Sequence, residues 1–383
     1  MSRIDQLIQE MCPDGVEQVA LEEVISYQQP GPFLVSSKNY RPEYQTPVLT
    51  AGKTFLLGYT NETEGIYQAS VDSPVIIFDD FTTAFRWVDF PFKVKSSAMK
   101  FLTAETGEAF DLRYLFHAMS TIPYTPGDHK RQWISTYSKF QIPFPPIEIQ
   151  REIVRILDLF VDLDRELEQE IDGRDKQFEI VLDRLLDKVD AGTQVKQISE
   201  VCSRVVSGGT PSSKVEEYYG GSIPWVRTQD VKMNIIREAS ATITEAGLEA
   251  SSAKWIKANS VIVAMYGATA GKVAITANPV TTNQACCNLE VDDQIADFRF
   301  VFYWLMKNYR QLKGLGEGSQ SNLNAAKVKS FEIPLPPLEV QADIAQKLDI
   351  FIEYIDNLKR ERELRQKQYA HYRDLLLDLP VKE

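Results

Sequence analysis

Residues 142–160 read IPFPPIEIQREIVRILDLF, and residues 333–351 read IPLPPLEVQADIAQKLDIF. The offset of 191 residues between them holds without a gap as far as Asp187 and Asp378, and 19 of the 46 aligned positions are identical. Self-similarity at a fixed offset is the mark of a chain built from copies of one unit. The sequence therefore predicts two structural repeats.

Each copy opens with a Pro-Pro pair and continues with apolar residues at helical spacing. Because proline cannot sit inside a helix, the pair suits an extended segment that leads into one. Leu157, Leu163 and Leu167 belong to a stripe with a mean step near 3.5 residues, and charged residues lie between them. That pattern is typical of a coiled coil. We expect two long helices that pack on each other.

The parts of the chain before each helix match more loosely. The suggested pairs are Val16 with Val195, Pro47 with Pro224, Val75-Ile76 with Val261-Ile262, and Asp111-x-Arg113 with Asp297-x-Arg299. Short apolar runs at 73–78, 87–90 and 260–265 indicate strands, and 112–119 and 298–307 indicate helices. The expected fold is α+β, with two similar α/β domains separated and followed by long helices that pair as an antiparallel coiled coil.

We predict four segments. A first domain with a short N-terminal helix covers residues 1–141, a helical spacer covers 142–192, a second domain covers 193–332, and a second helical spacer covers 333–383. A length of 383 residues suits more than one core.

No apolar run approaches the roughly 20 residues needed to cross a bilayer, so we expect no membrane association and a cytoplasmic protein. The four cysteines have no metal-ligand spacing, and we expect them to be reduced and buried.

A net charge of -12 is at first sight unfavourable for nucleic-acid binding. The charge is unevenly distributed. Residues 142–192 hold 14 acidic and 7 basic side chains, whereas residues 193–331 hold 12 acidic and 15 basic ones. Residues 14–141, with 15 acidic and 11 basic side chains, remain negative. The acidity is therefore concentrated in a helical block, although the first domain stays acidic.

The chain resembles the specificity subunits of type I restriction-modification enzymes over essentially its whole length. The motifs that carry the resemblance are residues 142–150 and 333–341, CPDGV at 12–16, IPWVRTQD at 223–230 and GSQSNL at 318–323. The resemblance implies that each domain reads one half of a split double-stranded DNA target. It also implies that the helices bind two methyltransferase subunits, through which restriction subunits join, and that the chain has no catalytic site or cofactor of its own.

Arg and Lys pair with guanine edges, and Asn and Gln pair with adenine edges. In the second domain the candidate DNA contacts are Arg227, Thr228, Gln229, Asp230, Tyr266, Asn283, Gln284, Ser319, Gln320 and Asn322, with Lys272 as a phosphate contact. Each could equally be an ordinary loop residue. GATAGKV at 267–273 imitates a phosphate-binding loop, but it has three residues between the glycines and valine after the lysine, where the motif needs four and Ser or Thr.

In the first domain the candidates are Lys53, Tyr59, Asn61 and Arg86, because the segment at 50–53 occupies the place of the Arg227 segment. Aromatic residues in this stretch fill a core more often than they stack on a base. The first domain lacks a clear G-S-x-Q segment before its Pro-Pro pair. The role of that loop is assigned instead to Lys130, Arg131, Gln132 and Ser135.

Motifs for catalysis are not found. No G-x-G-x-x-G follows a strand, no amino-methylation motif occurs, and the three histidines are scattered. Asp79-Asp80 could hold a metal, but a lone acidic pair is more often a turn. Two alternatives stay open: a coiled-coil scaffold that recognises only protein, and a self-contained methyltransferase or nuclease. A gel shift with random duplex separates the first alternative from a DNA-reading subunit.

Overall fold

The computed structural model describes residues 3–52, 54–105, 110–127, 130–189, 193–316 and 323–382. The chain forms two compact units. Unit 1 comprises Met1–Glu168 and Arg360–Glu383, and unit 2 comprises Gln169–Lys359. Each of the two long helices therefore contributes one part to each unit. In the described part of the chain, no helix has both the length and the apolar character that a membrane span requires.

Unit 1 begins with a short N-terminal helix, α1 (Arg3–Met11), and contains two larger sheets. The larger sheet has the order β2 (Ile25–Gln28), β8 (Met99–Ala104), β5 (Val75–Asp79) and β6 (Phe85–Val88), and the smaller one has β4 (Leu56–Thr60), β3 (Thr46–Leu49) and β7 (Lys93–Val94). Strand β1 (Glu17–Ala20) pairs with β9 (Gln141–Phe144), and α3 spans Leu112–Met119. Alternation along β5 places Ile76 and Phe78 in one core and Val75 and Ile77 in another.

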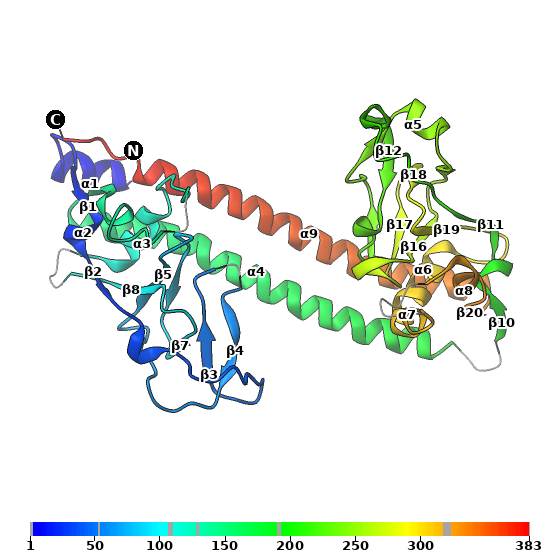
Figure 1. Cartoon of the computed structure of the whole chain (residues 1–383), viewed down its shortest axis with the longest axis horizontal. Coiled ribbons are helices and arrows are strands. Elements are labelled where there is room, and N and C mark those ends of the chain that lie inside the picture. Colours follow the sequence, from blue (N-terminus) through cyan, green and yellow to red (C-terminus); the bar gives the residue numbers. More distant parts are fainter. Residues whose placement is uncertain are drawn as a thin grey trace. The chain divides into compact units, whose positions relative to one another are not determined.

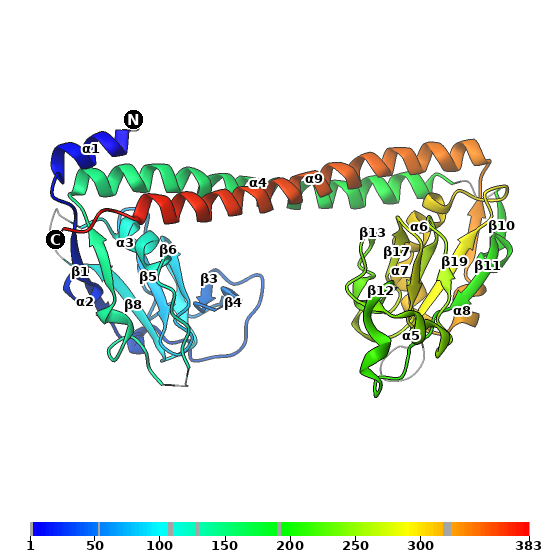
Figure 2. The same cartoon turned by 90° about the horizontal axis from the view of Figure 1, so that it is seen from above.

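Unit 2 repeats this plan with extra elements. Its larger sheet, seen in Figure 2, has the order β11 (Cys202–Ser207), β19 (Cys286–Val291), β16 (Val261–Ala264), β17 (Val273–Thr276) and β13 (Asn234–Ile236). The smaller sheet has β14 (Thr242–Ile243), β12 (Tyr219–Val226), β18 (Val280–Thr282) and β15 (Trp255–Ile256). Strand β10 (Gln194–Gln197) pairs with β20 (Glu332–Leu335), and the helices are α5 (Glu245–Glu249), α6 (Phe298–Lys307), α7 (Tyr309–Gly314) and α8 (Ala325–Lys329). The predicted helices at 112–119 and 298–307 are confirmed as α3 and α6.

The hydrogen-bond register corrects two of the suggested pairs. Ala20 lies opposite Gln141 and Gln197 lies opposite Glu332, so the counterpart of Val195 is Gln18 and not Val16. Likewise, β5 pairs with β8 as β16 pairs with β19. When these two pairings are compared, the counterpart of Val261 is Ile76, rather than Val75. A slip of one residue puts a strand side chain on the opposite face. Runs of similar apolar residues could not reveal that slip in the sequence.

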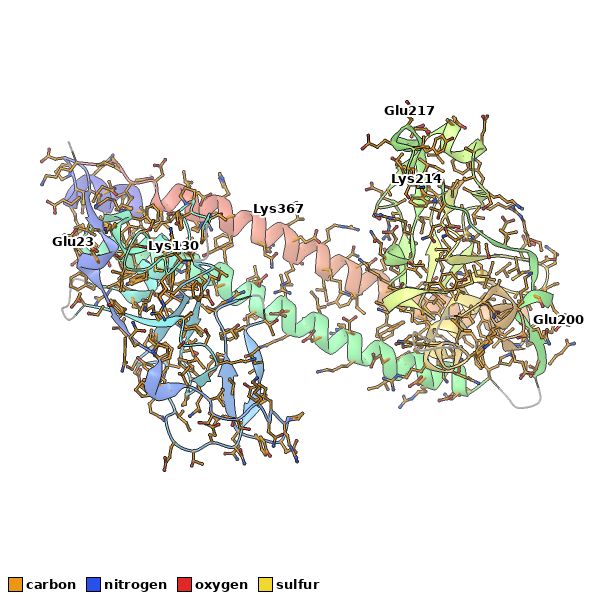
Figure 3. The ribbon with its side chains drawn as sticks, in the orientation of Figure 1. Glu23, Lys130, Glu200, Lys214, Glu217 and Lys367 are labelled. Carbon is orange, nitrogen blue, oxygen red and sulfur yellow. The ribbon has the colours of Figure 1, made fainter. Side chains whose placement is uncertain are left out.

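The short turns after β1 and β10 show the same repeat. Glu23 in α2 (Leu21–Val24) accepts a hydrogen bond from the Ala20 N–H at 3.0 Å. Glu200 in η3 (Ile198–Glu200) accepts one from the Gln197 N–H at 2.7 Å. Figure 3 labels both glutamates, one in each unit. The two units therefore share this capping contact as well as their strand order.

The predicted long helices are α4 (Ile147–Asp187) and α9 (Leu338–Leu377). In unit 1, Phe160 stacks on Tyr372 with ring centroids 5.4 Å apart, and Asp164 accepts two hydrogen bonds from the Arg362 guanidinium at 2.9 and 3.0 Å. In unit 2, Phe178 contacts Phe351. Residue numbers rise along one helix as they fall along the other, so the pairing is antiparallel, as predicted (Figure 1).

The repeated glutamine of the Pro-Pro motif fastens each domain to its helix. The side-chain Oε1 atoms of Gln150 and Gln341 accept hydrogen bonds from the N–H groups of Asp111 and Asp297 at 3.1 and 2.9 Å. Their Nε2 atoms donate, at 2.8 Å in both cases, to the carbonyl of the proline five residues earlier. Both glutamines are buried. The motif is therefore explained by a buried amide that satisfies one backbone group at the start of α3 or α6 and another just before α4 or α9.

A second pair of equivalent contacts joins α3 to α4 and α6 to α9. Arg113 donates to Asp158 at 2.8 Å, and Arg299 donates to Asp349 at 2.9 Å. Asp349 also accepts a hydrogen bond from the Tyr303 hydroxyl at 2.6 Å. In unit 1 the position of Tyr303 is taken by His117, whose Nε2 lies 2.9 Å from Asp158 and whose Nδ1 lies 3.0 Å from the Tyr369 hydroxyl.

This histidine predicts a pH effect on unit 1. Burial lowers the pKa of His117, and the hydrogen bond with Asp158 opposes this lowering only in part. The unfolded chain therefore binds more protons below about pH 6.5, and stability falls as the pH drops through that value. His117→Tyr, which copies Tyr303, should reduce the loss in hydrogen-exchange protection of α3 between pH 7.5 and 5.5. Equal losses in the wild type and the variant would contradict the prediction.

Candidate nucleic-acid interface

The predicted DNA contacts of unit 2 that the structure describes come from three loops at one end of the sheets. Strands β12 and β18 are parallel, with Val226 opposite Thr282, so both end at the same edge. Strand β16 ends at Ala264, which lies opposite the first residue of β19. The loops after β12, β16 and β18 therefore begin side by side.

Hydrogen bonds connect these loops directly. The Asn283 N–H donates to the Val226 carbonyl at 3.0 Å, and the Thr269 hydroxyl donates to the Thr228 carbonyl at 2.8 Å. The Met265 N–H donates to the Ala285 carbonyl at 2.8 Å. We call residues 227–230, 266–272 and 283–284 reading face 2. The structure brings together every described candidate of the second domain on this face.

Arg227 is held in place by its surroundings. It precedes η5 (Thr228–Asp230), and its N–H donates to the Asp230 carboxylate at 2.9 Å. Its Nη2 donates to the Ser240 hydroxyl at 3.0 Å, and the Gln229 Nε2 lies 3.4 Å from the same oxygen. The Arg227 Nε is buried without a hydrogen-bond partner in the described part of the chain. Ser240 thus positions two candidate base-reading side chains, and nothing in the sequence singled it out.

The side chains of reading face 2 differ in exposure. Gln229 and Gln284 are exposed, and Tyr266 is 41% exposed. Gln284 accepts a hydrogen bond from the Thr210 hydroxyl. Asn283 uses its amide oxygen within the loop, where it accepts from the Ala285 N–H at 3.2 Å. Gln229, Gln284 and Tyr266 are therefore the side chains most open to a ligand.

The candidates Ser319, Gln320 and Asn322 lie outside the described residues. Leu323 follows them in the chain, and its N–H donates to the Met265 carbonyl at 2.9 Å. Unit 1 has the same contact, because the Gln132 N–H donates to the Asp80 carbonyl at 2.8 Å. Residues 132 and 323 are 191 apart, so the helical offset extends back into this loop.

In unit 1, the equivalent loops also lie together at one end of the sheets. Strand β3 runs parallel to β7, with Leu49 opposite Val94, and the Asp80 N–H donates to the Ala98 carbonyl at 3.0 Å. Residues 50–52, 79–84, 95–98 and 130–131 therefore lie at one end of the sheets, and we call them reading face 1. Lys130, labelled in Figure 3, and Arg131 are exposed on it. Lys53 lies outside the described residues.

The expectation for Gln132 needs correction. Gln132 is only 3% exposed, and its amide accepts from the Tyr124 hydroxyl at 2.7 Å and donates to the Lys130 carbonyl at 2.9 Å. It occupies the place of the buried Leu323 and supports the loop. Ser135 also supports the loop, because its hydroxyl donates to the Arg131 carbonyl at 2.9 Å. The exposed cations of this loop are therefore Lys130 and Arg131.

Three further candidates of the first domain stand apart from reading face 1. Tyr59 lies opposite Pro47, near the start of β3, and Asn61 follows β4 at the same end of that hairpin. Gly52 lies at the other end. Arg86 is exposed on edge strand β6, opposite Ile77, and not in the turn that precedes it. These side chains do not gather with the loops.

Residues 95–97 also lie on reading face 1, although they are not among the residues expected from the sequence. The Ser96 hydroxyl accepts from the Ala98 N–H at 3.1 Å, as Asn283 accepts from Ala285, so the two residues are equivalent. Lys95 and Ser97 beside it are exposed. The signal available in the sequence was an alanine preceding an apolar strand in both repeats. The match was concealed because the loop before this alanine is one residue longer in unit 1, where it covers 95–97, than in unit 2, where it covers 283–284.

Asp79 and Asp80 serve as turn and core residues. The Asp79 carboxylate accepts from the N–H groups of Phe81 and Thr82 at 3.0 and 2.9 Å, which is a turn contact. The Asp80 carboxylate lies 3.3 Å from the Lys100 ammonium, and both side chains are 1% exposed. Across the described residues, no group of three or more His, Cys, Asp or Glu side chains could hold a metal. The four cysteines are free, and burial raises the pKa of Cys287 to about 12.

Two repeated α+β domains, each with polar loops at one end of its sheets and each continued by a long helix, define a modular two-domain recognition protein. A family model described as the type I restriction modification DNA specificity domain matches residues 13–173 and 191–366. The chain therefore belongs to the type I restriction-modification specificity subunits, with two target recognition domains.

Individual relatives agree with this assignment. The specificity subunit of the Escherichia coli type I restriction enzyme EcoR124I/EcoR124II is 41% identical over 406 aligned residues, which cover 100% of this chain and 98% of that protein. The MjaIX specificity subunit of Methanocaldococcus jannaschii is 31% identical over 47% of this chain and 42% of its own length. The solved S subunit from M. genitalium has a TM-score of 0.62 at 14% identity, covering 94% of this chain and 95% of that one, and it shows the same fold.

Proposed function

We propose that this specificity subunit reads a bipartite double-stranded DNA target, with one half assigned to each recognition domain. Catalysis is left to two methyltransferase subunits docked on the helices, and restriction subunits join through them. The chain itself needs no cofactor and acts in the cytoplasm. The observation that carries the proposal is the recurrence of a polar reading face at the same strand ends in both units.

The chemistry of reading face 2 supports base recognition. Arg227 can offer two parallel N–H groups to a guanine edge, and Gln229 and Gln284 can pair with adenine. The hydrogen bond from the Arg227 N–H to Asp230 holds the backbone, and the bond from its Nη2 to Ser240 holds the side chain, before DNA arrives, which reduces the entropy lost on binding. The second domain also carries a local excess of three positive charges over residues 193–331.

Exposed apolar side chains on the helices support the docking of two identical partners. Leu159 on α4 is 60% exposed, and Ile350, which stands 191 residues later on α9, is 62% exposed. Apolar side chains of this size at equivalent exposed positions suit a protein contact better than solvent. Because the positions are equivalent, they fit two copies of one partner. The family assignment makes methyltransferase subunits the natural occupants.

Arg227→Ala tests the reading of bases. In the complex with methyltransferase subunits, the variant should lose about 1–3 kcal/mol of specific binding and accept several bases at one position of one half-site. Ser240→Ala should produce a smaller relaxation at the same position, because it releases the guanidinium without removing it. Methylome sequencing of cells that carry each variant gives the result. Arg237→Ala is the matched control, since Arg237 pairs with Asp356 instead.

Two outcomes would count against the proposal. If Arg227→Ala weakened binding to specific and random duplex equally, Arg227 would be a phosphate contact and the base-reading assignment would be wrong. If the wild-type complex gave no gel shift with any duplex at low salt, the chain would be a scaffold that recognises only protein.

A further inference from the structure

Three cations of unit 2 line one cleft of about 870 Å³ beside reading face 2. They are Lys232, which follows η5, Lys272 at the end of the β16–β17 loop, and Arg310 in α7. In the part of the chain that the structure describes, none of the three side chains forms a salt bridge or side-chain hydrogen bond. Lys307 and Lys359 of the same cleft are already paired, with Asp187 and Asp175.

The close packing of α7 on the loop makes these cations one continuous strip. Gly271 has a φ of +83°, and a Cβ atom built on it would lie 3.0 Å from the Lys313 Cβ and 3.2 Å from the Tyr309 carbonyl. Only glycine allows α7 this approach. On the other side, the Met233 N–H donates to the Val273 carbonyl at 2.9 Å, which brings Lys232 next to Lys272.

We infer that Lys232, Lys272 and Arg310 bind consecutive phosphates of the DNA whose bases reading face 2 contacts, so that unit 2 supplies a backbone anchor. This inference rests on the proposed function. Unpaired cations next to base-reading loops are what phosphate contacts require, since such contacts fix the register of a protein on the duplex. The helix wall of the cleft carries Glu179 and Asp183, so the phosphates stay at the domain side.

Unit 1 has no equivalent strip among its described residues. The segment after α3, at residues 120–127, reads STIPYTPG and contains no cation, whereas the equivalent segment of unit 2 carries Lys307, Arg310 and Lys313. Prolines 123 and 126 also prevent a helix like α7 there. The backbone anchoring is therefore unequal between the two recognition domains.

The test compares the wild-type complex with a triple variant, Lys232→Ala, Lys272→Ala and Arg310→Ala, at a series of salt concentrations. Each phosphate contact contributes about 0.9 to the slope of log K against log salt, so the triple variant should lose about 2–3 units of slope. Binding to cognate and to random duplex should weaken by the same factor. Asp183→Asn should strengthen binding to both. Lys367→Ala, an exposed cation on α9 (Figure 3), is the matched control and should leave the slope unchanged.

An unchanged slope in the triple variant would overturn the inference, as would unchanged or weaker binding with Asp183→Asn. Native mass spectrometry of the same samples must show intact complexes with methyltransferase subunits. If the triple variant loses those subunits, the cleft is a protein-docking site and the inference is wrong. If the wild-type complex itself fails to prefer cognate DNA, the proposed function fails first. The two failures are therefore distinguishable.

Discussion

Asp80→Ala should lower the free energy of unfolding of unit 1 by about 3–5 kcal/mol, because it leaves a buried ammonium without its counter-charge. The Lys100 Nζ has no hydrogen bond within the described residues, so the carboxylate 3.3 Å away is the contact that offsets its burial. The same carboxylate accepts a hydrogen bond from the Trp133 N–H at 2.8 Å. Urea denaturation followed by hydrogen exchange in β5 and β8 measures the effect.

The double variant Asp80→Asn and Lys100→Met is the matched control for this prediction. It removes both charges while keeping similar volumes, so most of the lost stability should return. The asparagine keeps an oxygen that can accept from the Trp133 N–H, so a loss as large in the double variant as in Asp80→Ala would show that the unpaired buried charge is not the cause of the loss. Because Asp80 also holds the loop that carries Lys130 and Arg131, the single variant should lose recognition of the first half-site before that of the second.

Lengthening both helices should change the gap between the two half-sites. The units divide α4 between Glu168 and Gln169, and α9 between Lys359 and Arg360. Four residues inserted at each point add roughly 6 Å of helix and about one turn. If the helix pair sets the spacing of the recognition domains, the gap should grow by one or two base pairs of about 3.4 Å each. Methylome sequencing reads the gap directly.

The control variant carries the same four residues in the exposed turn between Ser70 and Ser73, where they should leave the gap unchanged. In the helix variant both half-sites should keep their sequences, because no residue of either reading face is altered. An active enzyme with an unchanged gap would refute the idea that the helices act as a spacer. So would a half-site with new bases.

The repeated helices and the two recognition domains could be predicted from the sequence because the Pro-Pro motif and its apolar stripe recur in strict register. The buried amides of Gln150 and Gln341 give a physical reason for the repeated glutamine, because each satisfies two backbone groups. The candidate DNA contacts were harder to predict from the sequence. Reading face 2 was found because its residues follow apolar strands in a recognisable order.

The missed residues of the site share a physical cause. Ser240 reaches Arg227 from the segment between β13 and β14, a contact that no local pattern encodes. In unit 1 the loops have changed length, so Lys95 and Ser96 could not be aligned with Asn283, and Gln132 was mistaken for a ligand-facing side chain. Its backbone N–H donates to the Asp80 carbonyl, which lies more than fifty residues earlier in the chain. Long-range hydrogen bonds and differences in loop length, neither of which the sequence reveals, determine where these residues lie.

The bonds that fasten each domain to its helix use a separate set of residues from the reading faces. Asp297 and Arg299 make the contacts to Gln341 and Asp349, and none of the four belongs to residues 227–230, 266–272 or 283–284. If the reading faces contact the bases as proposed, a mutation in a loop can change the bases that are read without loosening the domain from its helix. Selection can explore new targets one loop at a time while the framework stays intact. The architecture makes recognition evolvable at little expense to folding.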